Sequence, residues 1–217
     1  MNEKGNIIKT QSFVSSNVVK LLSIRGMTVI ALLSALSTVL MLFEMPLWFA
    51  PIFYKIDFSE VPVLIGAFTL GPLAGVIIEL IKILLNLFIN GTETAFVGEI
   101  ANFILGCSLV VPSAFIYHLA KTRKSAILGM GIGTIVFIVT GCILNAYVLL
   151  PVYAKIYGMP MESLVAFGTL LNPNIKNLTT FIFFAVAPFN LIKGLLVTII
   201  TAILYKRVSP IIQGYRK

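Results

Sequence analysis

Residues 180–205 read TFIFFAVAPFNLIKGLLVTIITAILY, a run of 26 residues with a single charged side chain. About 20 apolar residues in a helix cross the hydrocarbon core of a bilayer, so this run is long enough to span it with some tilt. Asn190 and Lys193 interrupt the run three residues apart, which places them on one face of a helix. The run therefore predicts a membrane helix that carries an amide and an ammonium group in its interior.

The composition of the whole chain is also typical of an integral membrane protein. Hydrophobic residues make up 59% of the 217 positions, charged residues make up 11%, and the mean hydropathy is +1.03. So little polar surface cannot cover a soluble protein of this length. The formal net charge is +8, but the basic residues flank apolar runs instead of clustering on a polar module, so no nucleic-acid partner is predicted.

The apolar runs predict an all-α integral membrane protein with six transmembrane helices. Breaks at proline, glycine or charge give approximate helix bounds of 27–46, 60–70, 72–89, 98–119, 126–150 and 180–205. The second and third helices meet at Leu70-Gly71-Pro72, a tight turn followed by a helix-starting proline, which predicts a hairpin. No linker or internal repeat divides the chain, so residues 1–217 are predicted to form a single six-helix membrane domain.

The basic residues predict the orientation of these helices. Eleven of the 16 lysines and arginines fall in one set of alternate segments, and three fall in the other set. The first set is 1–26, 120–125 and 206–217, and the second is 47–59, 90–97 and 151–179. Because cytoplasmic loops carry an excess of Lys and Arg, both termini are predicted to be cytoplasmic.

Several polar side chains lie within the predicted helices. Lys193 is about 20 Å into its helix at 1.5 Å per residue, with no acidic residue within one helical turn. Glu79 and Lys82, three residues apart, can instead neutralise each other. Asn145 lies about 9 Å inside the outer end of its own helix. One buried asparagine often only joins two helices, but two amides with an unpaired ammonium predict a polar binding site in the outer half of the membrane.

Two further groups of residues are candidates for this site. Glu99 and Asn102 form another pair three residues apart, which is either an exposed first helical turn or part of the site. The aromatic residues Trp48, Phe49 and Tyr54 lie in the first outer loop. They can form an aromatic belt at the membrane interface or a lid over a ligand.

No set of catalytic residues is recognisable in the sequence. It lacks a Ser/His/Asp combination, a metal-binding cluster and a phosphate-binding loop, so the chain is not predicted to be an enzyme or to hydrolyse ATP. Cys107 and Cys142 lie in apolar helices without a CxxC motif, which indicates neither a metal site nor a disulfide. A small membrane enzyme is thus a weak alternative. A pore is another weak alternative, because one set of polar residues is not enough to line a channel.

Four motifs suggest a family, and they are the most specific parts of a resemblance that spans nearly the whole chain. They are KIDFSEVP at 55–62, GPLAGV at 71–76, GEIANF at 98–103 and NLIK at 190–193. With these motifs the chain resembles the riboflavin-specific S-components, the substrate-binding membrane subunits of energy-coupling-factor vitamin transporters. The resemblance implies a multi-pass protein of the bacterial cytoplasmic membrane that binds riboflavin from outside as a transported ligand and needs no cofactor. It also implies ATP-dependent uptake in a complex with a membrane coupling subunit and two ATPase subunits.

The resemblance assigns roles to the candidate residues. The polar recognition set would be Asn145, Asn190 and Lys193. An aromatic side chain of the first outer loop would cover the flavin rings, and Glu99 and Asn102 are weaker candidates for contacts with the tail. Riboflavin presents carbonyl acceptors beside an N–H donor, which suits an asparagine that both donates and accepts. An S-component for another vitamin, such as thiamine or pantothenate, is the nearest alternative.

The first helix also carries a possible docking surface. Ala31 and Ala35 form a face of small residues, continued by Thr38, that lets another helix approach closely. By the same resemblance, this face would dock on the coupling subunit. Packing against a neighbouring helix of the same chain is the alternative.

Overall fold

The computed structural model describes residues 21–48, 51, 54–92, 94–156 and 158–213, with side chains described as far as Tyr205. The helices in chain order are α2 (Ile24–Leu42), α3 (Glu60–Leu70), α4 (Pro72–Asn90), α5 (Val97–Ala120), α6 (Arg123–Leu144), α7 (Leu150–Ile156), α8 (Met161–Leu171), α9 (Leu178–Phe181) and α10 (Ala187–Gln213). The π-helical turns η1 (Asn145–Leu149) and η2 (Ile182–Val186) join α6 to α7 and α9 to α10 without a break.

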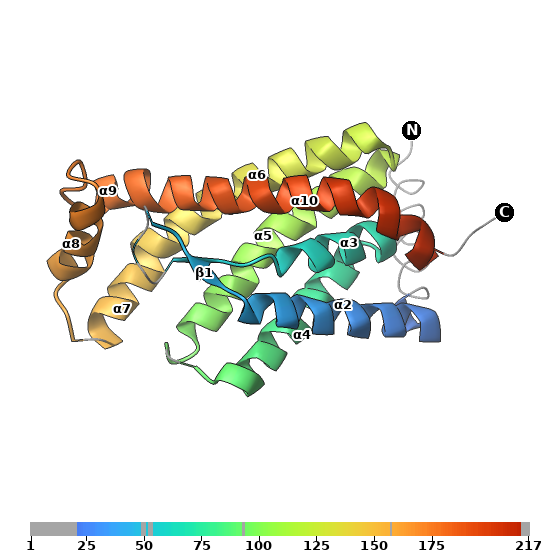
Figure 1. Ribbon diagram of the computed structural model, residues 1–217, viewed down its shortest axis with the longest axis horizontal. Coiled ribbons are helices and arrows are strands. Elements are labelled where there is room, and N and C mark those ends of the chain that lie inside the picture. The colour runs from blue at the N-terminus through green and yellow to red at the C-terminus, as the bar shows by residue number, and fades with distance from the viewer. Residues whose placement is uncertain (1–20, 49–50, 52–53, 93, 157, 214–217) are drawn as a thin grey trace, which may run out of the picture.

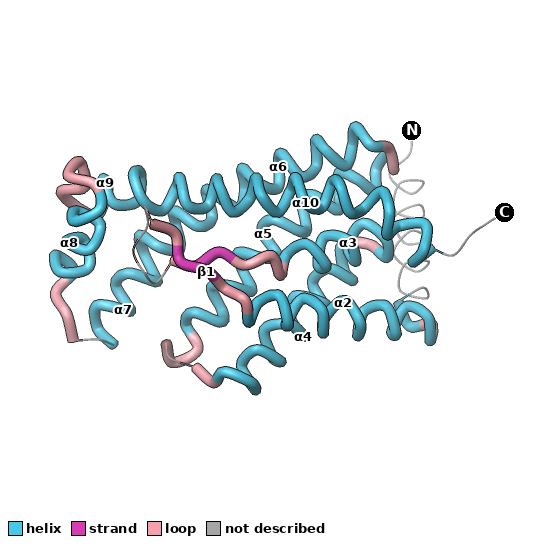
Figure 2. Tube along the Cα trace, in the orientation of Figure 1, coloured by secondary structure: helices cyan, strands magenta, loops and turns pink. Residues whose placement is uncertain are grey.

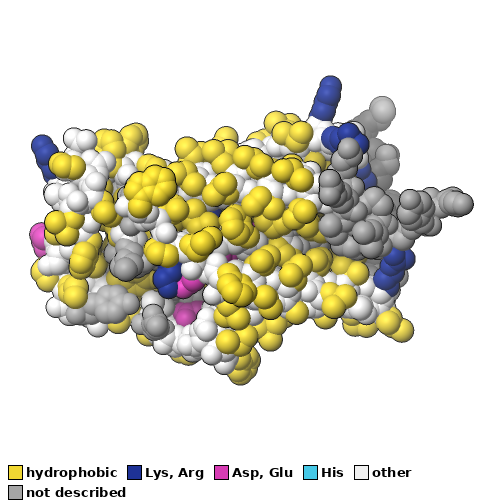
Figure 3. Space-filling view, viewed as in Figure 1, with side chains coloured by type: hydrophobic (Ala, Val, Ile, Leu, Met, Phe, Trp, Pro, Cys, Tyr) yellow, Lys and Arg dark blue, Asp and Glu magenta, His cyan; other side chains and the backbone are white. Residues whose placement is uncertain are grey.

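The helices form one bundle, as predicted for an all-α chain (Figure 1). The start of α2 and the end of α10 lie at one end of the bundle, and α8 lies at the other end. Within the described residues, five stretches are long and apolar enough to cross a membrane, namely 24–42, 72–90, 97–120, 123–156 and 178–205. Hydrophobic side chains cover most of the middle of the face shown in Figure 3, as expected for a surface in contact with lipid.

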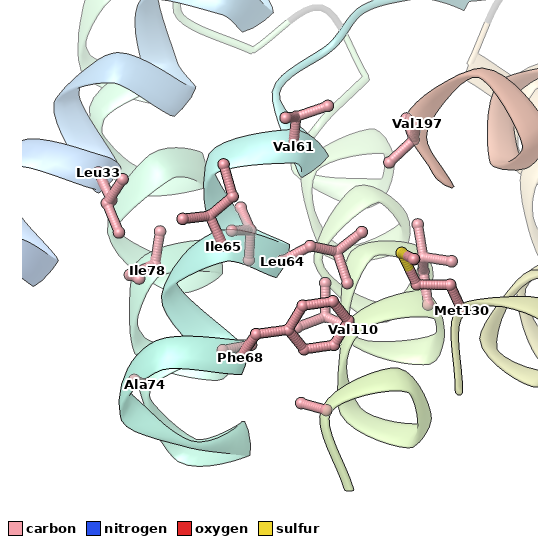
Figure 4. Packing of buried hydrophobic residues seen from close by; sticks show 14 of the residues in the cluster. Leu33, Val61, Leu64, Ile65, Phe68, Ala74, Ile78, Val110, Met130 and Val197 are labelled. Atoms are coloured by element: carbon pink, nitrogen blue, oxygen red, sulfur yellow. The ribbon is translucent and has the colours of Figure 1, made fainter. Parts of the chain in front are cut away.

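The remaining predicted span, 60–70, is helix α3 with the predicted bounds, but it is only 11 residues long. Its side chains are buried on every side, with Val63, Leu64 and Ala67 at 0% exposure. Figure 4 shows Leu64 and Phe68 of α3 among side chains of the surrounding helices. A helix that is hydrophobic all round is one that other helices enclose, so α3 forms the centre of the core.

Several predicted boundaries are wrong. The last helix ends at Gln213 rather than at 205, and the fifth begins at Arg123 rather than at 126. The first helix ends at Leu42 rather than at 46, because Met45 and Pro46 form strand β1 (Met45–Pro46), which pairs antiparallel with β2 (Lys55–Ile56) in the α2–α3 loop (Figure 2). Proline disfavours the helical conformation of the residue before it, which explains why α2 ends before Pro46. The segment 151–179, predicted as a loop, contains the rest of α7 and the whole of α8.

Each π-helical turn ends two residues before a proline within a continuous helix. Pro151 and Pro188 are the second residues of α7 and α10. Proline lacks an N–H group and clashes with the carbonyl one turn earlier, and a local widening of the helix relieves this conflict. Asn145 begins η1 and Asn190 follows Pro188 by two residues. The irregular turns therefore lie beside both asparagines of the predicted site, and π-helical turns are frequent at functional sites.

Helices α5 and α6 pack closely through glycines of α6. A Cβ atom at Gly129 would lie 2.5 Å from the carbonyl oxygen of Ser113, and one at Gly133 would collide with the hydroxyl of the same serine. Small residues at such an interface let two backbones approach, which is the main source of helix association in lipid.

We expect Gly133→Leu to destabilise the protein by about 1–3 kcal/mol or more, because the added side chain must displace the backbone of α5. The matched control is Gly131→Leu, since no atom lies within 4 Å of a Cβ at Gly131. Thermal unfolding of the purified variants measures the difference. Equal midpoints for the two variants would contradict the close packing of α5 and α6.

Candidate ligand-binding site

A cavity of about 140 Å³ lies between the α2–α3 loop and helices α3, α5, α6, α7 and α10. This volume is well above the roughly 10–15 Å³ that one water molecule needs, so the cavity is more than a packing defect. Its lining combines polar and aromatic side chains. The lining residues are Tyr54, Lys55, Glu60, Gly98, Ala101, Asn102, Leu105, Phe137, Asn145, Leu149, Tyr153, Phe189, Asn190 and Lys193.

The structure brings most of the predicted site residues together. The predicted residues that line the cavity are Tyr54, Asn102, Asn145, Asn190 and Lys193. Glu99 is not among the lining residues, and its carboxylate accepts a hydrogen bond from Thr94 Oγ1 at 3.2 Å. Trp48 does not line the cavity either and is 85% exposed. Phe49 lies outside the described residues.

Tyr54 and Asn145 form one hydrogen-bonded unit in the cavity wall. The Tyr54 hydroxyl donates to Asn145 Oδ1 at 2.6 Å, and Asn145 Nδ2 donates to the carbonyl of Gly141 at 2.8 Å. Burial raises the pKa of Tyr54 well above its ordinary value, so the hydroxyl keeps its proton and remains a donor. Tyr54 therefore fixes the Asn145 amide, in addition to contributing an aromatic surface.

Asn190 offers a hydrogen-bond donor that the described part of the chain leaves unused. Its side chain is 3% exposed, and Nδ2 has no hydrogen-bond partner among the described residues. The amide fits against α6 because Gly141 has no side chain, and a Cβ there would collide with Nδ2. A buried donor without a partner costs about 1–3 kcal/mol. Nδ2 lies against Gly141, so the amide offers this donor to a ligand in the cavity when its two ends exchange places.

Lys193 is not the unpaired ammonium that the sequence predicted. Its Nζ lies 2.9 Å from Asp57 Oδ2, in a pair whose side chains are 12% and 9% exposed. The other carboxylate oxygen of Asp57 accepts a hydrogen bond from the backbone N–H of Ser59 at 2.8 Å. Burial alone would raise the pKa of Asp57, but the positive charges of Lys193 and Lys82 outweigh it and hold this pKa below its ordinary value.

A second buried charge cluster lies beside the cavity. The predicted pair of Glu79 and Lys82 is confirmed at 2.7 Å, and Glu60 joins it with Oε1 at 2.8 Å from Lys82 Nζ. Gly106 of α5 makes room for the Glu79 carboxylate, because a Cβ there would collide with it. Of these charged residues, only Glu60 lines the cavity.

The charges that line the cavity are balanced. The charged lining residues are Lys55, Glu60 and Lys193. Among the described residues, each has a partner of opposite charge that does not itself line the cavity, namely Glu44, Lys82 and Asp57. A charged ligand would find no free counter-charge here, so the cavity suits an uncharged ligand with hydrogen-bonding groups.

The apolar lining was not predicted from the sequence. The missed residues include Leu105, Phe137, Leu149 and Phe189, which look like any other core residue in an apolar helix. Phe189 packs against Tyr54 with ring centroids 5.1 Å apart. Its only sequence signal is its position next to Asn190. Aromatic walls with a few polar groups are typical of sites for small flat ligands.

Long apolar helices around a small, charge-balanced cavity define the class as a membrane protein that binds a small molecule. The chain belongs to the family described as the substrate-specific component of the ECF transporter, whose profile matches residues 25–205. Members of this family are transporter components, and the resemblance found in the four sequence motifs is thereby confirmed.

Individual relatives agree with the family. The chain is 38% identical to the riboflavin transporter RibU of Staphylococcus aureus (strain TCH60), over 85% of this chain and 90% of that protein. It is 32% identical to the riboflavin transporter FmnP of Bacillus subtilis (strain 168), over 90% and 97% of the two chains. A solved structure described as the S component of a bacterial ECF transporter superposes with a TM-score of 0.67 at 33% identity. It covers 87% of this chain and 97% of the other.

Proposed function

We propose that this protein is the riboflavin-binding subunit of an energy-coupling-factor transporter and mediates ATP-dependent riboflavin uptake with partner subunits. The cavity supports this function because its unpaired Asn190 amide and its Lys193 ammonium can donate to the carbonyl oxygens and ring nitrogens of a flavin. Tyr54 and Phe189 provide apolar surface for the rings. The relatives RibU and FmnP are both named riboflavin transporters, which supports the same ligand.

The charge balance of the cavity separates riboflavin from the alternative vitamins. Thiamine carries a permanent positive charge and pantothenate carries a carboxylate, whereas riboflavin is uncharged at neutral pH. Each charged lining residue already has a partner among the described residues, so a charged vitamin would bring an uncompensated charge into a site largely removed from water. An absorbance spectrum of the purified protein tests the choice. A flavin spectrum supports riboflavin, and a different bound vitamin identified by mass spectrometry would contradict it.

The proposal includes the way in which the chain sits in the bacterial cytoplasmic membrane. Six spans, with short α3 as the second, would make residues 1–217 a single multi-pass domain with both termini in the cytoplasm. The basic residues favour this orientation. The start of α2 and the end of α10 also lie at one end of the bundle, which agrees with it (Figure 1).

Single cysteines at Thr122 and Gly158, introduced after replacement of Cys107 and Cys142, are expected to react from opposite sides of the membrane. Thr122 is the N-cap residue of α6, and Gly158 follows α7 at the far end of the same continuous helix. An impermeant thiol reagent applied to intact cells should therefore label only the cysteine at 158. Labelling of both positions from outside would contradict the six-span arrangement.

Energy for uptake would come from partners, namely a membrane coupling subunit and two ATPase subunits. We propose Ala31 and Ala35 of α2 as the surface for the coupling subunit. Both residues are exposed in the isolated chain, as a docking surface requires. Thr38, predicted to continue this surface, does not: it is 3% exposed and its hydroxyl donates to the carbonyl of Ser34. The exposed surface of small residues on α2 is therefore limited to Ala31 and Ala35.

A further inference from the structure

We propose that Asp57 sets the preference of the cavity for an uncharged flavin over its phosphorylated form, by neutralising Lys193 without touching the ligand. The inference rests on the proposed function, because it concerns selectivity at the same site. In this role Asp57 is a positioning residue: it acts on the ligand only through the Lys193 ammonium.

The geometry keeps the Asp57 carboxylate in one place. The residue follows β2 directly and is 7% exposed, and it does not line the cavity. One oxygen binds Lys193 Nζ at 2.9 Å and the other accepts the Ser59 N–H at 2.8 Å. Because both oxygens have fixed partners, the carboxylate holds the ammonium at the cavity wall with its charge already compensated.

The other charges around the cavity cannot take over this function. The pair of Lys55 and Glu44 has side chains 43% and 42% exposed, so solvent screens it. Glu60 presents negative charge, and the Lys82 ammonium that faces it is shared with Glu79. Lys193 is therefore the one buried cation among the described lining residues, and Asp57 determines whether its charge is available to a ligand.

A phosphate ester carries a charge of about −1.5 to −2 at neutral pH. Because the phosphate ends the polyol tail and Lys193 is assigned to the flavin rings, this charge would act on Lys193 across the cavity and not by direct contact. In the wild-type cavity the Asp57 carboxylate offsets the attraction between the Lys193 ammonium and the phosphate. Without the Asp57 charge, the buried ammonium would be unpaired and would attract the phosphate. Uncharged riboflavin would gain nothing from that change and would lose the fixed position of the Lys193 donor.

The test is the affinity of purified Asp57→Asn for riboflavin and for flavin mononucleotide, measured by quenching of flavin fluorescence. We expect riboflavin affinity to fall several-fold and the affinity ratio of the two ligands to move toward the phosphorylated one by roughly tenfold or more. Glu44→Gln is the matched control, because it removes the same charge from the exposed pair. That variant should change the ratio by less than about threefold, as expected for a screened charge.

Variants of Lys193 show whether Asp57 acts through it. Lys193→Met alone leaves a buried carboxylate, so it should move the ratio in the opposite direction, toward riboflavin. In the Lys193→Met background, Asp57→Asn removes the unpaired carboxylate and leaves a neutral pair, so it should return the ratio only to about the wild-type value. A ratio in the double variant as far toward the phosphorylated flavin as in Asp57→Asn alone would overturn the inference, because Asp57 would then act without Lys193.

The outcomes for the inference and for the proposed function are distinct. If the wild-type protein binds riboflavin and Asp57→Asn leaves the ratio unchanged, the selectivity inference is wrong and the function stands. If Asp57→Asn does not fold, Lys193→Met still tests the inference. An unchanged affinity ratio of the two flavins in that variant would also overturn it. If the wild-type protein binds no riboflavin, the proposed function itself fails.

Discussion

Replacing Asn190 with leucine is expected to weaken riboflavin binding roughly 5- to 150-fold without lowering the unfolding midpoint of the protein. Loss of a hydrogen bond in a site removed from water costs on the order of 1–3 kcal/mol, which gives this range. The fold should tolerate the change, because Nδ2 has no partner among the described residues and leucine has the same number and branching of side-chain heavy atoms. Titration of the purified variant with riboflavin and its thermal unfolding measure the two effects.

Asn145→Leu is the matched comparison for this prediction. Its amide accepts from the Tyr54 hydroxyl and donates to the Gly141 carbonyl, so its loss removes two buried hydrogen bonds, one of which holds the buried Tyr54 hydroxyl. We therefore expect Asn145→Leu to lower both affinity and stability, whereas Asn190→Leu lowers affinity alone. If Asn190→Leu binds riboflavin as tightly as the wild type, the Asn190 amide does not contact the ligand.

Replacing Ala35 with tryptophan is expected to abolish riboflavin uptake while riboflavin binding by the isolated subunit survives. A bulky side chain would hold the α2 backbone away from the coupling subunit and remove the close packing that drives helix association in lipid. Ala35 is exposed and does not line the cavity, so binding should be retained. Co-purification with the coupling subunit and riboflavin titration of the variant give the two readouts.

The control for Ala35→Trp is Ile135→Trp, on the exposed surface of α6, where the native side chain is already large and 62% exposed. This variant should assemble and transport like the wild type. Loss of riboflavin binding by Ala35→Trp with intact assembly would assign the alanine surface to the fold of the subunit itself. Unchanged uptake would remove the surface from the transport mechanism.

The sequence predicted elements well where local signals are strong. Helix α3 has its predicted bounds because charges precede it and Gly71-Pro72 ends it. The end of α2 was placed too late, because Met45 and Pro46 are apolar enough to continue a helical pattern although they form a strand. Helix α8 was missed because its 11 residues are too short to give a clear membrane signal in an outer segment.

The candidate site was predicted only in part, for a physical reason. Asn145, Asn190 and Lys193 stood out because polar groups are costly within apolar helices. The partner of Lys193 did not, because Asp57 is 136 positions away and only the tertiary fold brings the two together. Phe137 and Phe189 gave no signal either, since an apolar side chain toward a cavity and one toward the core look the same in sequence.

The most direct test of the proposed function is a titration of the purified wild-type subunit, without partner subunits, with riboflavin, thiamine and pantothenate in parallel. We expect saturable binding of riboflavin at one site per chain and no measurable binding of the two charged vitamins at the same concentrations. Binding of thiamine or pantothenate in preference to riboflavin would contradict it, because the charged groups of the cavity would then be available to a ligand rather than paired with Glu44, Lys82 and Asp57.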